Sequence, residues 1–326
     1  MSTSKMPVLV SIVSTNDGPW LTSCFDSLAA IRDQVNVVVV ANNCDDNTEE
    51  ICAAAPLNIT VLRTATRLGF AACNNLTLHR ALQEGYEYAF LLNPDTRVRP
   101  DTVSSLVEFM RSHPEFGITG SVQMEYGDET WTQLNEWSRV TLDHAATLGA
   151  QQKSSDGFTW IEHYYVQGAA LMLRLKLAER IGLLDPVYGT FYEETDLCRR
   201  CLFSGHKVAI LLTSRVRHYG GGNWKSNLAK HHRRDFLMLR NSFLYYVSGA
   251  KSRAHMASET FRVLGNEIRT VLFHREDVIL PWWRYGQVLW SAFRSAKDIL
   301  QLYKRNRIIR SGAVVPESLW AVGTDT

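Results

Sequence analysis

Four short apolar runs alternate with segments of helical periodicity in the N-terminal part of the chain, and this alternation is the strongest constraint on its fold. The runs cover residues 8–13, 37–40, 59–62 and 88–92, and the segments between them carry apolar side chains at helical spacing. Strands that alternate with helices join one mostly parallel sheet, because each helix returns the chain to the edge where the last strand began. The sequence therefore predicts an α/β fold with a mostly parallel central sheet flanked by helices.

Polar loops follow three of these strands, at 14–18, 41–47 and 93–97. Open α/β sheets bind ligands outside the carboxyl ends of their strands, so we expect the three loops to share one crevice. Asp95 follows Pro94, whose ring keeps the backbone extended. A carboxylate there suits a hard divalent cation whose other ligands are water and substrate phosphates. Ordinary turn chemistry is the alternative reading of this aspartate.

Acidic side chains gather at the start of a predicted helix that ends at Phe203, namely Glu193, Glu194 and Asp196. Crowding raises the pKa of at least one carboxyl group, which a general base requires. Stabilisation of the helix dipole is the alternative. His218 ends a later strand and precedes a glycine-rich loop. A neutral imidazole can bind a metal ion there, although a lone histidine is more often structural.

The middle of the chain gives weaker signals. Residues 121–163 lack a regular pattern and are predicted to form a substrate-facing region. Residues 166–174 resemble a strand, and 207–212 and 215–218 resemble two further strands. Tryptophans at 131, 137 and 160 suit stacking on acceptor rings, with buried packing as the alternative.

The charges are unevenly distributed, although 35 Lys and Arg against 33 Asp and Glu give a formal net charge of only +2. Up to Asp196 the acids outnumber the bases by 25 to 13, and beyond it the bases outnumber the acids by 22 to 8. Twelve bases and one acid lie in residues 199–253. This block suits a diphosphate or a lipid headgroup, with a solvated face as the alternative. The chain has no recognisable nucleic-acid module, so we expect no nucleic-acid partner.

The six cysteines are scattered and the N-terminal residues lack the apolar core of a signal peptide. These features predict free thiols in the cytoplasm. No apolar run reaches the ~18 residues that a membrane span requires. We expect a cytoplasmic protein, with peripheral contact to the inner face of the membrane as an option.

A helical pattern begins near residue 230. One predicted apolar face carries Trp282, Leu289, Phe293, Ala296, Leu300 and Tyr303, and positive charge comes from Arg284, Arg294, Lys297, Lys304 and Arg305. Such a helix can lie on an anionic membrane. Packing against the core or against a second subunit is the alternative.

Taken in order, these segments resemble the inverting family 2 glycosyltransferases, particularly the rhamnosyltransferase-like branch, over about residues 7–250. The opening strand through Asn16 resembles the family's nucleotide-binding strand. Four further segments carry the resemblance: Leu68–Ala71 with Asn74 and Asn75, Leu91–Thr96 as a variant of the DxD motif, Gly182–Asp185, and Phe191–Arg200 as the acceptor-site acidic motif.

The resemblance implies a GT-A type, Rossmann-like fold. It divides the chain into a glycosyltransferase domain at 1–250, with its nucleotide-binding half at about 1–120 and its acceptor half at about 121–250, and a helical extension at 251–326. The implied activity moves a sugar from a nucleotide diphosphate-sugar, such as dTDP-rhamnose or a UDP-sugar, to an acceptor hydroxyl. The implied acceptor is a saccharide or lipid-linked saccharide of bacterial surface polysaccharide or glycolipid synthesis. The implied cofactor is Mg²⁺ or Mn²⁺.

The resemblance also assigns roles to individual residues. It makes Asp95 and His218 the metal ligands and Glu194 the catalytic base, with Asp196 as the alternative base. The expected donor-binding residues are Ser14, Asn16, Asn43, Asp45, Arg67, Gly69, Asn74, Asn75, Asn93 and Asp95. The expected acceptor-binding residues are Gly168, Glu193 and Trp160.

Three positions depart from the family pattern. Ala41 stands where an aspartate usually reads the pyrimidine base, so Asn43 or Asp45 is expected to supply that contact. Arg67 replaces a common asparagine, and Glu194 replaces the usual aspartate. Ala41 also leaves room for a second hypothesis, a non-catalytic carbohydrate- or membrane-binding component of a polysaccharide assembly.

Overall fold

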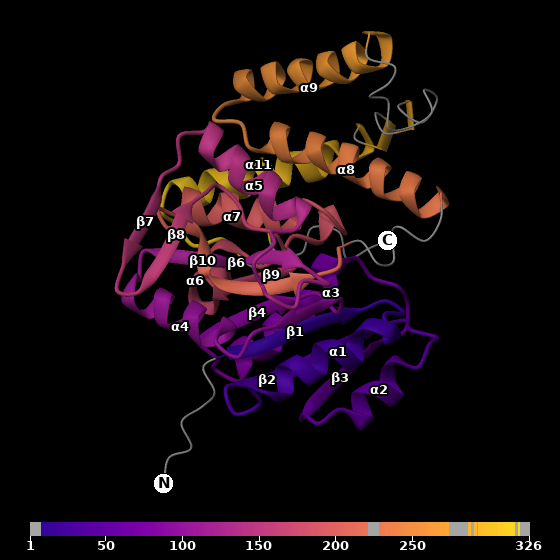
Figure 1. The fold of residues 1–326 in the computed structure, drawn as a ribbon. Helices are drawn as coiled ribbons and strands as arrows, with labels where there is room; N and C mark the ends of the chain where they lie inside the picture. The colour runs from indigo at the N-terminus through magenta and orange to yellow at the C-terminus, as the bar shows by residue number, and fades with distance from the viewer. Residues whose placement is uncertain are drawn as a thin grey trace.

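The computed structural model describes residues 8–220, 228–273, 286–287, 290–291, 293–316 and 319. A single sheet of ten strands forms the centre of this part of the chain (Figure 1). The strands are β1 (Val8–Ser14), β2 (Val35–Asn42), β3 (Ile59–Thr64), β4 (Tyr88–Leu92), β5 (Thr96–Val98), β6 (Phe116–Glu125), β7 (Gln152–Ser155), β8 (Phe158–Glu162), β9 (Ala170–Arg174) and β10 (Lys207–His218).

The order of the strands places β1 and β4 near the middle of the sheet. Their neighbours follow the order β3-β2-β1-β4-β9-β6-β10-β8-β7, and β5 pairs with the end of β10. Most of the strands point in one direction: β1, β2, β3, β4, β6, β7 and β10 run together, and β5, β8 and β9 run against them. The expectation of an α/β fold with a mostly parallel central sheet is therefore confirmed.

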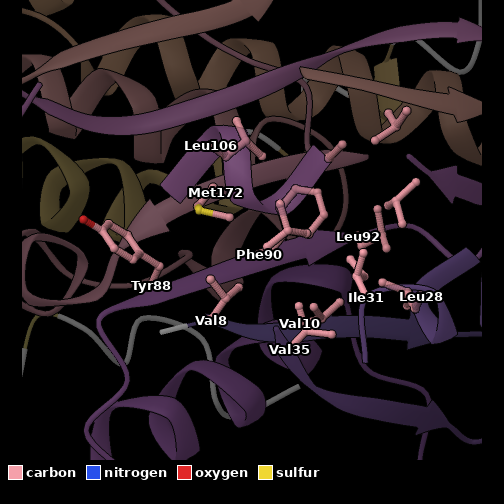
Figure 2. Packing of buried hydrophobic residues seen from close by; sticks show 14 of the residues in the cluster. Val8, Val10, Leu28, Ile31, Val35, Tyr88, Phe90, Leu92, Leu106 and Met172 are labelled. Carbon is pink, nitrogen blue, oxygen red and sulfur yellow. The ribbon is translucent and has the colours of Figure 1, made fainter. Parts of the chain in front are cut away.

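Helices cover both faces of the sheet. Their bounds are α1 (Gly18–Ala29), α2 (Thr48–Ala54), α3 (Phe70–Gln83), α4 (Thr102–Ser112), α5 (Glu136–Thr147), α6 (Leu175–Ile181), α7 (Glu193–Phe203), α8 (Leu228–Ser248), α9 (Arg253–Phe273) and α11 (Ala296–Arg310), with a 3₁₀ turn, η1 (Pro186–Tyr188). On one face Val8, Val10 and Phe90 pack with Leu28 of α1 and Leu106 of α4 (Figure 2). The opposite face packs against α3, α6 and α7. Alternate residues of β1 enter the two cores because side chains of a strand point to alternate faces.

The prediction of an irregular region at 121–163 is wrong. Most of β6, the whole of α5, and strands β7 and β8 lie there. Two other expectations also change. The strand expected at 166–174 is limited to β9, and the two strands expected after residue 206 form one strand, β10, with an irregular register between Leu211 and Arg215.

The C-terminal helices lie at one end of the molecule, where α11 packs against α7 and α8 (Figure 1). The apolar face predicted for this region is wrong, because Phe293 and Leu300 are exposed and Tyr303 is buried. The buried side of α11 is instead formed by Ile299, Leu302, Tyr303, Arg305, Asn306 and Ile309. Trp282 and Leu289 lie outside the described residues. In the part of the chain that the structure describes, no helix is both long and apolar enough to cross a bilayer.

Candidate active site at the carboxyl ends of the strands

The loops after β1 and β2 lie against each other. The backbone N–H of Asp45 donates to Asn16 Oδ1 at 3.0 Å, and the backbone N–H of Gly18 donates to Asp46 Oδ2 at 2.9 Å. Asn16 and Asn43 have positive φ angles of 64° and 49°, which asparagine tolerates in tight turns. Two of the loops predicted to share a crevice are thus joined by hydrogen bonds.

The third loop brings Asp95 to His218. Strand β5, which follows Asp95 directly, pairs antiparallel with the end of β10, so that Thr96 lies opposite His218. The Nε2 atom of His218 lies 3.2 Å from Asp95 Oδ1. The backbone N–H of Gly220 donates to Asp95 Oδ2 at 3.2 Å. Burial acts to raise the pKa of Asp95, but the interactions with His218 and the backbone outweigh it and the pKa is lowered. The carboxylate is therefore held ionised.

The spacing of this pair fits a small divalent cation. Adjacent ligands of an octahedral Mg²⁺ ion, at about 2.1 Å and right angles, lie about 3.0 Å apart. The two atoms of Asp95 and His218 are separated by 3.2 Å. Among the described residues, no group of three His, Cys, Asp or Glu side chains is arranged to hold a metal ion. The protein would therefore supply two ligands, and the remaining positions would fall to phosphate oxygens and water.

Asn93 connects this pair to the other half of the site. Its Nδ2 atom lies 3.4 Å from His218 Nε2, and its backbone N–H donates to Ala169 O at 3.0 Å. The preceding Gly168 lies beside the side chain of Glu194, because a Cβ atom on this glycine would lie 3.6 Å from Glu194 Cβ. A short path of contacts therefore runs from His218 to Glu194.

The turn before α7 has an unusual backbone. Phe191 and Tyr192 have φ angles of 72° and 73°, in the left-handed region that bulky residues avoid. Such a conformation costs on the order of 1–3 kcal/mol per residue and needs support from its surroundings. Asn241 of α8 provides it, because its Nδ2 atom donates to the carbonyls of Tyr188, Thr190 and Phe191 at 2.7, 3.0 and 2.8 Å.

The two acids at the start of α7 have no cationic partner among the described residues. The Oε2 atoms of Glu193 and Glu194 are both buried and accept no hydrogen bond from the described protein atoms. Burial raises the pKa of Glu194, and burial together with the charge of Glu194 raises the pKa of Glu193. A carboxylate with a raised pKa and free lone pairs can accept a proton from a hydroxyl group.

Asp196 has the opposite surroundings. It is fully buried, and its two oxygen atoms contact Arg199 at 2.5 Å and Arg200 and Arg305 at 2.8 Å. Burial acts to raise its pKa, but the three guanidinium groups lower it well below the usual range. Tyr188 Oη lies 3.3 Å from Oδ1. Asp196 therefore stabilises the interface of α7 with α11, and its geometry does not fit the role of an alternative base.

Several residues expected to bind the donor use their side chains within the protein. Asn74 Oδ1 accepts from Ser11 Oγ at 2.8 Å, and the amide of Asn75 bonds to the backbone N–H and carbonyl of Leu184 at 3.1 and 2.7 Å. These bonds fix α3 to β1 and to the turn before η1. Ser14 is fully buried, with its Oγ 3.1 Å from a threonine hydroxyl of α2.

Gly69 is required for a close approach of two backbones. A Cβ atom at this position would lie 2.6 Å from Gly189 Cα, closer than real Cβ atoms come. The N–H of Ala71 donates to Gly189 O at 3.0 Å in the same contact. The neighbouring Arg67 is exposed, and its charge acts to lower the pKa of Asp17. The segment around Gly69 therefore joins the first half of the sheet to the turn before α7.

The three tryptophans have different surroundings. Trp160 is 6% exposed and packs with Phe109, 5.2 Å between ring centroids, so its expected contact with the acceptor is contradicted by its place in the core. Trp131 stacks under the guanidinium of Arg217 at 4.3 Å. Trp137 is 51% exposed and lies beside the loop that follows His218, since a Cβ atom on Gly220 would lie 3.2 Å from its Nε1.

The sequence did not single out two residues that belong to this edge of the sheet. Asp17 was part of a turn signal, yet burial, followed by repulsion from Asp95 and Asp46, raises its pKa to about 6. Gln123 lay in the region predicted to be irregular, yet its Oε1 atom lies 2.7 Å from His218 Nδ1. A strand predicted at 116–125 would have directed attention to Gln123.

The mostly parallel sheet with helices on both faces is the GT-A type fold that solved glycosyltransferase structures share. The mannosyltransferase PcManGT from Pyrobaculum calidifontis, solved with GDP-Man and Mn²⁺, is similar with a TM-score of 0.57 and 14% identity over 95% of this chain and 86% of that one. TarS 1–349 of S. aureus, solved with UDP, is similar with a TM-score of 0.56 and 13% identity over 94% and 88%. GalNAc-T7, solved with UDP, GalNAc and Mn²⁺, is similar with a TM-score of 0.52 and 15% identity over 76% and 51%.

The chain belongs to glycosyltransferase family 2, because the family model described as "Glycosyltransferase like family 2" matches residues 6–236. A comparison with curated proteins gave no match.

Proposed function

We propose that the protein is an inverting, metal-dependent glycosyltransferase that moves a sugar from a nucleotide diphosphate-sugar to a hydroxyl group of a saccharide or lipid-linked saccharide. The observation that carries the proposal is the path of contacts from the Asp95–His218 pair through Asn93 and Gly168 to Glu194, whose Oε2 atom accepts no hydrogen bond from the described protein atoms. It gives one edge of the sheet a cation site and a base. Synthesis of a bacterial surface polysaccharide or glycolipid is the proposed role.

Asp95 and His218 would hold Mg²⁺ or Mn²⁺ together with the diphosphate of the donor. A bound divalent cation supplies positive charge that offsets the charge developing on the leaving diphosphate. Asp95 is prepared for this task because its lowered pKa keeps it ionised. The structures of PcManGT and GalNAc-T7, whose fold is similar, contain Mn²⁺.

Glu194 would act as the base in a single displacement. It would take the proton of the acceptor hydroxyl as that oxygen attacks the anomeric carbon from the face opposite the diphosphate, so the configuration is inverted. Its buried, unpaired Oε2 atom and raised pKa support this assignment over Asp196, whose oxygens are occupied by arginines. The acceptor would bind beside Gly168, where a Cβ atom would lie 3.6 Å from Glu194 Cβ.

The donor nucleotide would bind the loops after β1 and β2. Ala41 is buried within β2, so the base would be read by the exposed Asn43 or by Asp45. The exposed Arg67 would meet a phosphate. A dTDP-rhamnose or UDP-sugar donor is proposed from the resemblance, and the solved structures with a similar fold contain GDP-Man or UDP.

The exposed side of the last helix would contact an anionic membrane that presents a lipid-linked acceptor. The backbone bonds Ser295 N–Ser291 O and Ile299 N–Ser295 O, at 3.1 and 2.9 Å, continue the helical pattern of α11 towards residue 290. Exposed residues recur at spacings of three and four along one stripe, Trp290, Phe293, Lys297, Leu300, Lys304 and Arg307. Aromatic side chains mixed with cations, without an acid, fit the interface of an anionic bilayer.

Vesicle sedimentation tests this contact. The wild type should sediment with vesicles that contain phosphatidylglycerol and remain in solution with pure phosphatidylcholine, because the stripe is cationic. Phe293→Ser should weaken the binding about tenfold, whereas Phe261→Ser, on the exposed side of α9, should not. Equal binding to both vesicles, or a dimer that Phe293→Ser dissociates, would contradict the assignment to a membrane.

A screen of nucleotide-sugars with Mn²⁺, followed by Glu194→Gln, tests the catalytic proposal. The variant should bind the active donor with unchanged affinity and lose transfer by about 10²-fold or more, because only the proton acceptor is removed. Glu193→Gln changes the neighbouring acid, which is expected to bind the acceptor, and should raise KM more than it lowers kcat. Turnover of Glu194→Gln near the wild-type rate would refute the base. A protein that binds no donor, with or without metal, would favour the non-catalytic scaffold.

A further inference from the structure

Two buried side-chain amides, of Gln123 and Asn135, lie in a row on the Nδ1 side of His218. Gln123 lies on β6, which is hydrogen-bonded alongside β10, and is 2% exposed. Its Oε1 atom lies 2.7 Å from His218 Nδ1. Asn135, at the start of α5, is 4% exposed and directs its Nδ2 atom to the same Oε1 at 3.3 Å. The histidine is thus the last member of a series of hydrogen-bonded groups that begins at the N-terminus of α5.

The backbone at that N-terminus determines which atom donates in each hydrogen bond of this series. The N–H of Ser138 can only donate, and it donates to Asn135 Oδ1 at 2.9 Å. The other atom of the Asn135 amide is therefore the NH₂ group, which donates to Gln123 Oε1. A carboxamide oxygen only accepts, so His218 Nδ1 must carry the proton that bonds to it.

We propose that Gln123 is a positioning residue that fixes His218 in the tautomer with its proton on Nδ1, and so prepares Nε2 as a metal ligand. With the proton on Nδ1, the lone pair of Nε2 faces Asp95 Oδ1 at 3.2 Å and the amide nitrogen of Asn93 at 3.4 Å. Two lone pairs at this distance repel each other unless a proton or a metal ion lies between them, and in the metal-free protein a proton on Nε2 that bonds to Asp95 fills that place. The inference rests on the proposed function, since it concerns the same metal pair.

A purely structural role for Gln123 makes a different prediction. A buried amide needs hydrogen-bond partners in any case, and removal of its acceptor would lower stability without regard to metal. A positioning role predicts two further effects, a change of the imidazole tautomer and a loss of metal affinity, because hydrogen bonds to the distal nitrogen of a metal-binding histidine set its tautomer and orientation.

The tautomer is read directly by long-range ¹H–¹⁵N NMR of the metal-free protein at alkaline pH. The signal of His218 is identified by its absence in His218→Gln. The wild type and Gln123→Glu, which keeps an acceptor oxygen, should show the proton on Nδ1. Gln123→Met, which removes the acceptor at similar volume, should show a mixture or the Nε2–H form.

Titration with Mn²⁺ alone, followed by electron paramagnetic resonance of the free ion, gives the second readout. Affinity should fall about 10- to 100-fold in Gln123→Met and be retained in Gln123→Glu. An unchanged tautomer or unchanged affinity in Gln123→Met overturns the inference and leaves the metal site intact. Equal Mn²⁺ binding by the wild type and His218→Gln overturns the metal site of the proposed function, and the inference with it.

Discussion

Removal of the Arg305 side chain tests how α11 is bound to the rest of the protein. Arg305 is 2% exposed, and its guanidinium contacts the carboxylates of Asp185 and Asp196. In Arg305→Met, Asp196 keeps Arg199 and Arg200 as partners. Asp185 loses its only cation within hydrogen-bonding distance among the described residues. The perturbation therefore falls mainly on Asp185.

The size of the effect follows from what Asp185 does without its partner. Burial raises its pKa above the usual 3.8 even beside Arg305, so the variant should take up a proton. Protonation at pH 7, about 3 units above the unfolded value, costs about 4 kcal/mol. Loss of one partner of a buried pair costs about 3–5 kcal/mol by experience with other proteins. We therefore expect Arg305→Met to lower the free energy of unfolding by about 3–5 kcal/mol at pH 7.

This mechanism predicts the direction in which the stability difference between the variant and the wild type changes with pH. An acid whose folded pKa is raised contributes stability below its unfolded pKa and loses it as the pH rises through the folded value. The deficit of Arg305→Met against the wild type should therefore shrink by about 1.4 kcal/mol per pH unit as the pH falls from 7 to the raised pKa of Asp185 in the wild type, and should stay constant below it.

Urea unfolding followed by circular dichroism measures both quantities. Arg307→Met, an exposed position on the same helix, is the control and should stay within about 0.5 kcal/mol of the wild type. The double variant Asp185→Asn with Arg305→Met should be more stable than Arg305→Met alone, because it leaves no bare acid. A loss below about 1 kcal/mol, or a deficit independent of pH, would refute the reasoning.

Three further predictions concern the active-site edge. Gly69→Ala should lower the free energy of unfolding by about 1–3 kcal/mol, because its Cβ atom would meet the backbone of Gly189 at 2.6 Å; an unchanged melting temperature would contradict the contact. Burial is the main reason that the pKa of Asp17 is raised to about 6. Ionisation of Asp17 therefore lowers the free energy of unfolding of the metal-free protein as the pH rises from 3.8 through 6, and the total loss is about 3 kcal/mol. Asp17→Asn should therefore be more stable than the wild type at pH 8 and equal to it below pH 4 by urea unfolding. EDTA should abolish transfer and Mn²⁺ restore it, whereas Asp95→Asn should not be restored at the same Mn²⁺ concentration.

The sequence predicted the strands in the first part of the chain well, for physical reasons that particular residues make clear. Strand β4 was found to the residue, because a continuous apolar run followed by a polar loop marks it. The approach of Asp95 to His218 was expected from the family resemblance, and the two side chains do lie 3.2 Å apart. The pattern of strands alone predicted only that the loop at 93–97 would lie near the loops after the first two strands.

Strand β6 was missed because its composition reflects what packs on it. A Cβ atom on Gly117 would lie 2.1 Å from Leu177 Cδ2, and one on Gly120 would lie 2.7 Å from Val166 Cβ. Glycine is thus required where other elements press on the strand, and the pattern no longer resembles a strand. The polar side chain of Gln123, on the same strand, is hydrogen-bonded to His218 Nδ1.

The role of Asp196 was also beyond the sequence. Its carboxylate is matched by Arg305, 109 positions later in the chain. Local periodicity carries no information on such a pairing, so the acid resembled its neighbours at 193 and 194. Only the structure distinguishes Asp196, whose charge is neutralised by arginines, from Glu194, which has no cationic partner among the described residues.

The backbone contact between Gly69 and Gly189 joins the start of α3 to the turn that leads to Tyr192 and Glu194. Two hydrogen bonds strengthen it, because the N–H of Ala71 donates to Gly189 O at 3.0 Å and the N–H of Phe70 donates to Thr190 Oγ1 at 3.3 Å. We therefore expect a ligand that displaces the first turn to displace the second turn as well.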